Sequence, residues 1–130
     1  DALSATQAAI EEGIVPGGGV ALVRLSQKIT VPKNKKHTGF EAGINIVKRA
    51  CLVPFKQIVE NSGGVPDVVL QKVLHLKKNS GYNAAIAEYG DMMELGIIDP
   101  VKVVRCALKN SASAASMLLT VGCAMVDDLD

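Results

Sequence analysis

Aromatic residues are scarce in this sequence, and tryptophan is absent. Phe, Trp and Tyr together make up 3% of the 130 residues, although hydrophobic residues as a whole reach 48%. A chain of this length buries roughly two-thirds of the surface that it exposes when unfolded, so the core must consist of Ala, Val, Leu and Ile. Such small side chains favour close helix packing. The composition therefore predicts one mainly helical domain, or a piece of a larger protein.

The sequence also lacks an excess of positive or negative charge. The formal net charge is +1, which gives no overall field to attract nucleic acid or an anionic membrane. Residues 30–38 form a basic stretch, but no aromatic residue interrupts it, so a solvated loop is favoured over a nucleic-acid site. No apolar run reaches the roughly 18 residues of a membrane helix.

Secretory features are missing from the start of the chain. The sequence opens with Asp1-Ala2-Leu3-Ser4, which is neither basic nor continuously apolar, so we expect no signal peptide and a cytoplasmic protein. Because Asp1 lies directly inside a helical pattern, we also expect the chain to be cut from a longer one.

Cysteines are few and widely spaced. The three are Cys51, Cys106 and Cys123, with no Cys-x-x-Cys pair. Neither His37 nor His75 lies at metal-ligand spacing from a cysteine. We therefore expect buried, reduced thiols and no metal site.

The apolar periodicity predicts a series of helices with one interruption. Pro54 and Pro66 suit the first position of a helix, where the missing N–H costs nothing. Asp99 before Pro100 predicts an N-cap for the last helix. Residues 81–89 lack a helical stripe and fit a short β-hairpin or an extended loop, and residues 120–126 are β-prone. The expected helices cover residues 1–12, 20–29, 40–52, 54–61, 66–78 and 100–119.

The sharpest local motif is Gly17-Gly18-Gly19 before a helix. Glycines admit a ligand close to the backbone, and a helix N-terminus offers unpaired N–H groups to an anion. The motif matches neither the P-loop nor the dinucleotide-binding fingerprint. A tight turn between packed helices is therefore at least as good an interpretation. Asp99 and Asn83 have equally simple alternatives, as a helix cap and as an Asx turn, so the residues alone assign no function.

Two long segments taken together resemble a known family. Residues 1–19, DALSATQAAIEEGIVPGGG, resemble the signature around the second ATP-contact segment of group I, GroEL-type chaperonins. GYNAA at residues 81–85, EYG at 88–90 and GIIDPVKV at 96–103 resemble the family's nucleotide-base segment, in the right order. PFKQIVENSG at residues 54–63 also matches, so the resemblance covers essentially the whole chain.

The resemblance implies a fold and a site. The fold would be the C-terminal half of an equatorial domain, an all-α or mainly α multi-helix bundle with a small hairpin and a β-prone C-terminus. Residues 1–12 would end the intermediate domain, and residues 13–130 would belong to the ATP-binding equatorial domain. The site residues would be Asp1, which orients the attacking water; Gly18, which meets the nucleotide through its backbone; Asn83, Ala84 and Ala85, which line the adenine pocket; and Asp99, which holds the ribose, with Ile98 as an apolar neighbour.

The resemblance also implies cofactors and partners. The parent would bind ATP and ADP, with magnesium and the phosphate loop held by residues outside this chain, so no metal ligand is expected within it. Partners would be other subunits of a double ring, with co-chaperonin and unfolded proteins bound through absent domains; we expect no nucleic acid and no membrane. The parent would be an ATPase that assists protein folding, whereas this chain alone should not turn over ATP. The alternatives are an assembly module without ligand binding and, if both motifs arose by chance, an unrelated helical scaffold.

Overall fold

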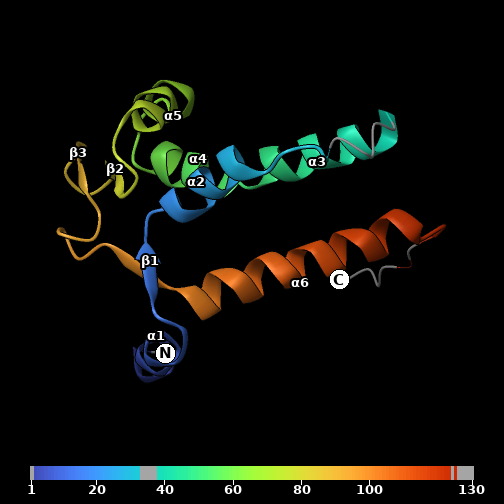
Figure 1. Ribbon diagram of the computed structural model, residues 1–130, viewed down its shortest axis with the longest axis horizontal. Coiled ribbons are helices and arrows are strands. Elements are labelled where there is room, and N and C mark those ends of the chain that lie inside the picture. The colour runs from blue at the N-terminus through green and yellow to red at the C-terminus, as the bar shows by residue number, and fades with distance from the viewer. Residues whose placement is uncertain (1, 33–37, 124, 126–130) are drawn as a thin grey trace, which may run out of the picture. The chain divides into compact units, whose positions relative to one another are not determined.

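The structure is a computed structural model that describes residues 2–32, 38–123 and 125 (Figure 1). The chain divides into two compact units, one of residues 1–13 with 100–130 and the other of residues 14–99. Asp1, the basic stretch at 33–37 and most of the C-terminal segment lie outside the described residues, so the predictions that fall on them stay predictions.

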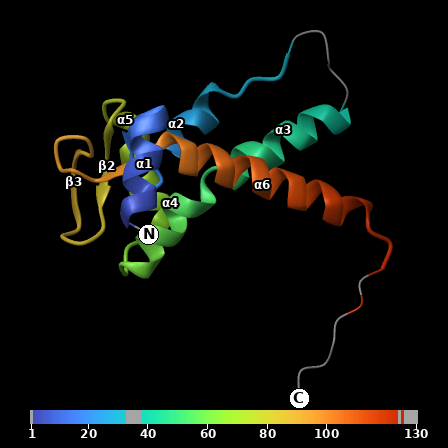
Figure 2. The same cartoon turned by 90° about the horizontal axis from the view of Figure 1, so that it is seen from below.

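The first unit pairs two helices, α1 (Ala2–Glu12) and α6 (Val101–Thr120). Figure 2 shows α1 beside the first turns of α6. Helix α1 ends at Gly13, whose left-handed φ of 84° suits glycine, and the Gly13 carbonyl accepts a hydrogen bond from the Val101 N–H at 3.0 Å. Ala8 is the buried residue of α1. Salt bridges from Lys102 to Glu11 and from Arg105 to Glu12 join the two helices at the surface.

The second unit holds four helices and the described strands. Its helices α2 and α3 precede the helical pair α4 and α5, and a hairpin of β2 and β3 follows (Figure 1). Strand β2 pairs antiparallel with β3, with Tyr82 opposite Tyr89, and β1 pairs with β4. The bounds are β1 (Ile14–Pro16), α2 (Val20–Lys28), α3 (Thr38–Ala50), α4 (Val53–Asn61), α5 (Pro66–His75), β2 (Ser80–Asn83), β3 (Glu88–Asp91) and β4 (Ile98–Pro100).

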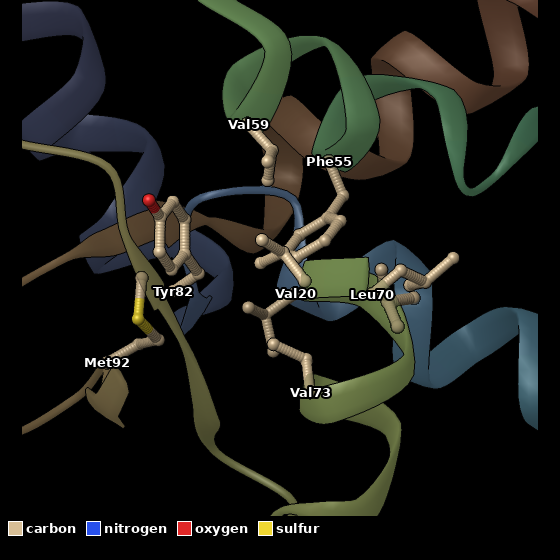
Figure 3. Close-up of a cluster of buried hydrophobic side chains, with 9 residues drawn as sticks. Val20, Phe55, Val59, Leu70, Val73, Tyr82 and Met92 are labelled. Carbon is tan, nitrogen blue, oxygen red and sulfur yellow. The ribbon is translucent and has the colours of Figure 1, made fainter. Parts of the chain in front are cut away.

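The core of the second unit lies where α2, α4, α5 and the hairpin meet. Phe55 from α4 fills its centre, and Tyr82 and Met92 close the hairpin side (Figure 3). With one buried phenylalanine and one buried tyrosine, the remaining volume is filled by aliphatic side chains, as the scarcity of aromatics predicts. The cluster comprises Val20, Val23, Phe55, Val59, Val69, Leu70, Val73, Tyr82 and Met92.

The mainly helical fold and the hairpin are confirmed. Helix α5 begins at Pro66, and Pro54 occupies the first turn of α4, as expected. Residues 121–123 and 125 lie outside any helix or strand, so the β-prone ending is not seen in the part that is described. Of the cysteines, only Cys51 is buried, whereas Cys106 is half-buried and Cys123 exposed; the expectation of three buried thiols is wrong.

The predicted cap at Asp99 is also wrong. Helix α6 begins at Val101, and Pro100 is its N-cap residue, with no side-chain cap hydrogen bond. Pro100 has the extended angles φ −65° and ψ 133°, because it still belongs to β4, which pairs with β1. Strand pairing therefore continues past Asp99 and shifts the helix start beyond the capping reach of its carboxylate.

A Cβ at Gly19 should destabilise the chain strongly. Gly19 has a φ of 79°, and an added Cβ would lie 2.7 Å from the Phe55 Cα, which backbone packing prevents from moving away. We expect Gly19→Ala to lower the free energy of unfolding by about 2 kcal/mol or more, measured by urea denaturation. Gly43→Ala in α3 is the matched control, since no atom lies within 4 Å of a Cβ added there. Alanine at this helix position should raise the free energy of unfolding by about 0.5–1 kcal/mol. Equal midpoints for Gly19→Ala and the native chain would contradict this account.

The Glu12 carboxylate should titrate below the usual range for glutamate. Arg105 donates to it through Nε at 3.0 Å and Nη2 at 2.5 Å, and these hydrogen bonds lower the pKa of Glu12. Because the folded pKa is depressed, the pair supports α1–α6 packing above the unfolded pKa of about 4.3, and that support is lost as pH falls through the folded pKa. In an NMR titration of side-chain carboxyls, Arg105→Gln should return the Glu12 pKa toward its usual value. Lys56→Gln, which removes a salt bridge in the other unit, should leave it unchanged; an unchanged Glu12 pKa in Arg105→Gln would contradict the assignment.

Candidate functional site

The glycine turn between β1 and α2 lies against two other segments. The Gly17 N–H donates to the Ile97 carbonyl at 2.8 Å, and a Cβ at Gly17 would lie 3.1 Å from the Ile97 backbone. Gly19 lies against the backbone of Phe55 on α4. These two glycines therefore have a steric reason to be glycine, which supports the interpretation of a tight structural turn.

Gly18 differs from its two neighbours. Its φ is 63°, and the one close neighbour of a Cβ there would be the flexible Met92 Cε at 3.0 Å, with the Tyr82 carbonyl at 3.8 Å and the Ile97 Cγ2 at 3.9 Å. Within the described part of the chain, the N–H groups of Gly18 and Gly19 donate no hydrogen bond. They lie at the N-terminus of α2, where the helix dipole favours a negative or oxygen-rich group. These two N–H groups are therefore candidates to bind a ligand oxygen.

The hairpin brings Asn83, Ala84 and Ala85 to the end of β2. Asn83 Oδ1 accepts a hydrogen bond from the Ala85 N–H at 3.1 Å, which is the Asx turn that the residue type suggested. Ala84 packs against the core, whereas Ala85 is exposed. The turn thus presents small apolar side chains and the Asn83 amide nitrogen, a combination suited to the flat face and polar edge of a base.

Asp99 lies on β4, two residues after the Ile97 carbonyl that binds the glycine turn. Its carboxylate makes no hydrogen bond or ion pair to any described residue. Ile98 beside it has 43% of its surface exposed. A carboxylate with free acceptor sites next to an exposed apolar side chain can bind a pair of sugar hydroxyls.

The second unit therefore brings most of the predicted residues near one another. Gly18 lies close to Tyr82, which precedes Asn83, and to Ile97, which precedes the Ile98–Asp99 pair. Asp1 falls outside the described residues, so its proposed role in orienting water is untested. No group of three or more His, Cys, Asp or Glu side chains that could hold a metal occurs among the residues that the structure describes. The glycine turn, the Asn83–Ala85 turn and Ile98–Asp99 are called the candidate wall below.

Comparison with known proteins identifies the family. A family model described as the TCP-1/cpn60 chaperonin family matches residues 1–128. The chain belongs to the TCP-1/cpn60 chaperonin family. A crystal structure of a group III chaperonin in the open state superposes with a TM-score of 0.80 at 29% sequence identity, covering 91% of this chain and 25% of that one. The chain therefore spans about a quarter of that chaperonin. No helix in the described part of the chain is both long and apolar enough to cross a membrane.

The candidate wall in this chaperonin chain does not coincide with a hollow beside α2. This hollow, with a volume of about 200 Å³, is lined by Val15, Pro16, Ala21, Arg24, Leu25, Lys28, Lys78 and Asn79. None of the candidate ligand residues lines it. The candidate site is therefore defined by the glycine turn and the hairpin and does not include this hollow.

Sequence reasoning missed two residues that shape this chaperonin site. Met92 is fully buried between Gly18 and Gly81, and Arg24 binds backbone carbonyls at the base of the hairpin. Met92 could have been suspected as an apolar residue next to the hairpin. Nothing in the sequence pairs Arg24 with carbonyl groups about fifty residues away.

Proposed function

We propose that this chain is the C-terminal part of a group I chaperonin subunit and supplies one wall of its ATP site. The observation that carries the proposal is the convergence of the glycine turn, the Asn83–Ala85 turn and the segment that ends at Asp99 in one compact unit. Each of these segments offers a group that the packing leaves free. Membership of the chaperonin family supports a nucleotide as the ligand.

Each segment suits a different part of adenosine nucleotide. Ala84, Ala85 and Ile98 would contact the adenine, with the Asn83 amide at its edge. The Asp99 carboxylate would accept hydrogen bonds from the ribose hydroxyls. The N–H groups of Gly18 and Gly19 would bind a phosphate oxygen at the N-terminus of α2. Asp1 would orient the water that attacks the terminal phosphate.

The whole protein would then be an ATP-driven folding chaperone. We propose a ring of subunits in the cytoplasm, with residues 1–12 ending the intermediate domain and residues 13–130 within the equatorial domain. Magnesium, co-chaperonin and unfolded substrate would be bound by parts of the subunit beyond this chain. Phosphoryl transfer depends on positioning and charge stabilisation around the phosphates, so the chain alone should not turn over ATP.

A second function, assembly, is favoured by helix α6. None of its 20 residues is buried, and Met117, Leu118 and Leu119 are 64–87% exposed. An apolar stripe of this kind marks a surface that another part of the assembly covers. The two functions are compatible, because the stripe and the candidate wall lie in different units.

Adenosine should perturb the candidate wall and little else. In an NMR titration of the ¹⁵N-labelled chain, we expect weak binding, with shifts at the amides of Gly18, Gly19, Ala84, Ala85 and Asp99. Dideoxyadenosine, which lacks both ribose hydroxyls, should bind roughly tenfold more weakly because two hydrogen bonds to a charged group are lost.

The Asp99 variant tests the ribose assignment. Asp99→Ala should bind the two nucleosides equally, whereas Asp67→Ala, a matched loss of an exposed carboxylate, should keep the native preference. Shifts confined to α6, or no shifts at saturating adenosine, would refute the nucleotide function and leave assembly. The same preference in Asp99→Ala as in the native chain would remove only the ribose role.

The α6 stripe should make the isolated chain self-associate. Burying it in a second copy removes apolar surface from water, so sedimentation velocity should show mass increasing with concentration. Leu118→Lys combined with Leu119→Lys should give a monomer, whereas Lys109→Gln on the same helix should not. A native chain that stays monomeric at all concentrations would contradict the assembly function for this surface.

A further inference from the structure

Arg24 makes more hydrogen bonds than any other side chain in the described part of this structure. Its Nη2 donates to the carbonyls of Lys77 at 2.8 Å, Val73 at 3.0 Å, Ser80 at 3.1 Å and Leu76 at 3.4 Å. Its Nε donates to the Lys78 carbonyl at 3.0 Å. These acceptors belong to the end of α5, to the connection that follows it, or, for Ser80, to the first residue of β2.

Arg24 adds a donor to carbonyls that the backbone satisfies only in part. The Val73 carbonyl already accepts the Leu76 N–H at 3.0 Å, and the Lys77 carbonyl accepts the Ser80 N–H at 2.9 Å, which leaves each oxygen one further lone pair. The last carbonyls of a helix have no partner within it and form the negative end of its dipole. Helix α5 ends at His75, so its final turn and the following connection present several such groups together. A planar guanidinium offers five N–H donors in a fixed fork and stays charged. Arg24 therefore satisfies a cluster of acceptors that water or a lysine would bind less completely.

A second contact on the same face of α2 holds the next residue of the hairpin. Val20 lies one helical turn before Arg24, and a Cβ at Gly81 would lie 2.3 Å from the Val20 Cγ2, so the two segments are in close contact. Residues four apart share a face of a helix. The hairpin is thus fixed at Ser80 by Arg24 and at Gly81 by Val20.

The glycine turn leads directly into helix α2, the same helix that carries Arg24. Gly18 lies in the turn two residues before α2 begins, and Ser80 and Asn83 are the two ends of β2. The position of the Asn83–Ala85 turn relative to the Gly18 N–H is therefore set where α2 meets β2. The opposite side of the connection is held as well, since the Met92 N–H donates to the Asn79 carbonyl at 3.0 Å.

We propose that Arg24 is a positioning residue of the nucleotide site, one that fixes the β2–β3 hairpin against the glycine turn. The proposal rests on the proposed function for its ligand, but its geometric content stands apart from it. Arg24 touches no candidate ligand group itself. It acts through Ser80 and the connection before it. These set the distance between the Asn83–Ala85 turn, which would contact the base, and the glycine turn, which would contact the phosphate.

Substitution of Arg24 should separate affinity from stability. In the adenosine titration, Arg24→Gln should lower affinity by about tenfold, the cost of one misplaced ligand contact. Arg24→Lys keeps the positive charge but loses the planar guanidinium, so its adenosine affinity should lie between those of Arg24→Gln and the native chain. If Arg24→Gln does not fold, the same measurements are made on Arg24→Lys. Residual dipolar couplings should show the amides of residues 80–91 reoriented relative to those of α2 in both variants.

A variant that is destabilised elsewhere tests whether Arg24 affects affinity only through overall stability. Val69→Ala removes buried volume from α5 without touching an acceptor of Arg24, so it should lower stability while changing adenosine affinity less than about twofold. If Val69→Ala loses as much affinity as Arg24→Gln, or if Arg24→Gln keeps the native affinity and couplings, the proposal is overturned.

The two proposals can fail separately. A native chain that does not respond to adenosine refutes the nucleotide function. The couplings then decide the role of Arg24 alone: a reoriented hairpin in Arg24→Gln supports it as the residue that positions the hairpin, and an unchanged hairpin overturns it.

Discussion

The close approach of backbones at the glycine turn is the constraint on which the second unit depends. Gly19 lies against the backbone of Phe55, and Gly17 lies against that of Ile97. Without a Cβ at either position, α2 can lie directly on α4 while β1 reaches β4. The core around Phe55 and the pairing of β1 with β4 both depend on that contact. The ligand site proposed at Gly18 is therefore compatible with tight packing at Gly17 and Gly19, so the two interpretations of the motif do not exclude each other.

The backbone preferences of single residues predicted the helix ends that depend only on those residues. Pro66 begins α5, and Gly13 ends α1, because each residue has a backbone preference that no neighbour opposes. Asp99 shows where this reasoning stops. A cap preference worth about 1 kcal/mol competes there with strand pairing to β1, a segment more than eighty residues earlier. Such a partner leaves no periodic signal near Asp99, so its effect could not be read from the residues around it.

The site was predicted less by residue chemistry than by resemblance. Taken alone, Asn83 is explained by the Asx turn that it forms, and the glycines are explained by packing. Only the order of the motifs along the chain indicated that these segments contact one ligand. Arg24 was found by neither route, because its partners are backbone carbonyls. Any residue can supply a carbonyl, so the identities of Val73, Lys77 and Ser80 carry no sign of the interaction.

The two units also differ in how their helices are stabilised. In the second unit, α2, α4 and α5 each bury side chains in a shared core. In the first, α6 buries none, and α1 is joined to it by one small buried residue, surface salt bridges and a backbone hydrogen bond. Exposed ion pairs contribute little to stability. The candidate wall thus lies in a unit with a shared core of its own, whereas α6 buries no side chain. Nucleotide binding and assembly would accordingly draw on different parts of the same sequence, one preorganised and the other completed by a partner.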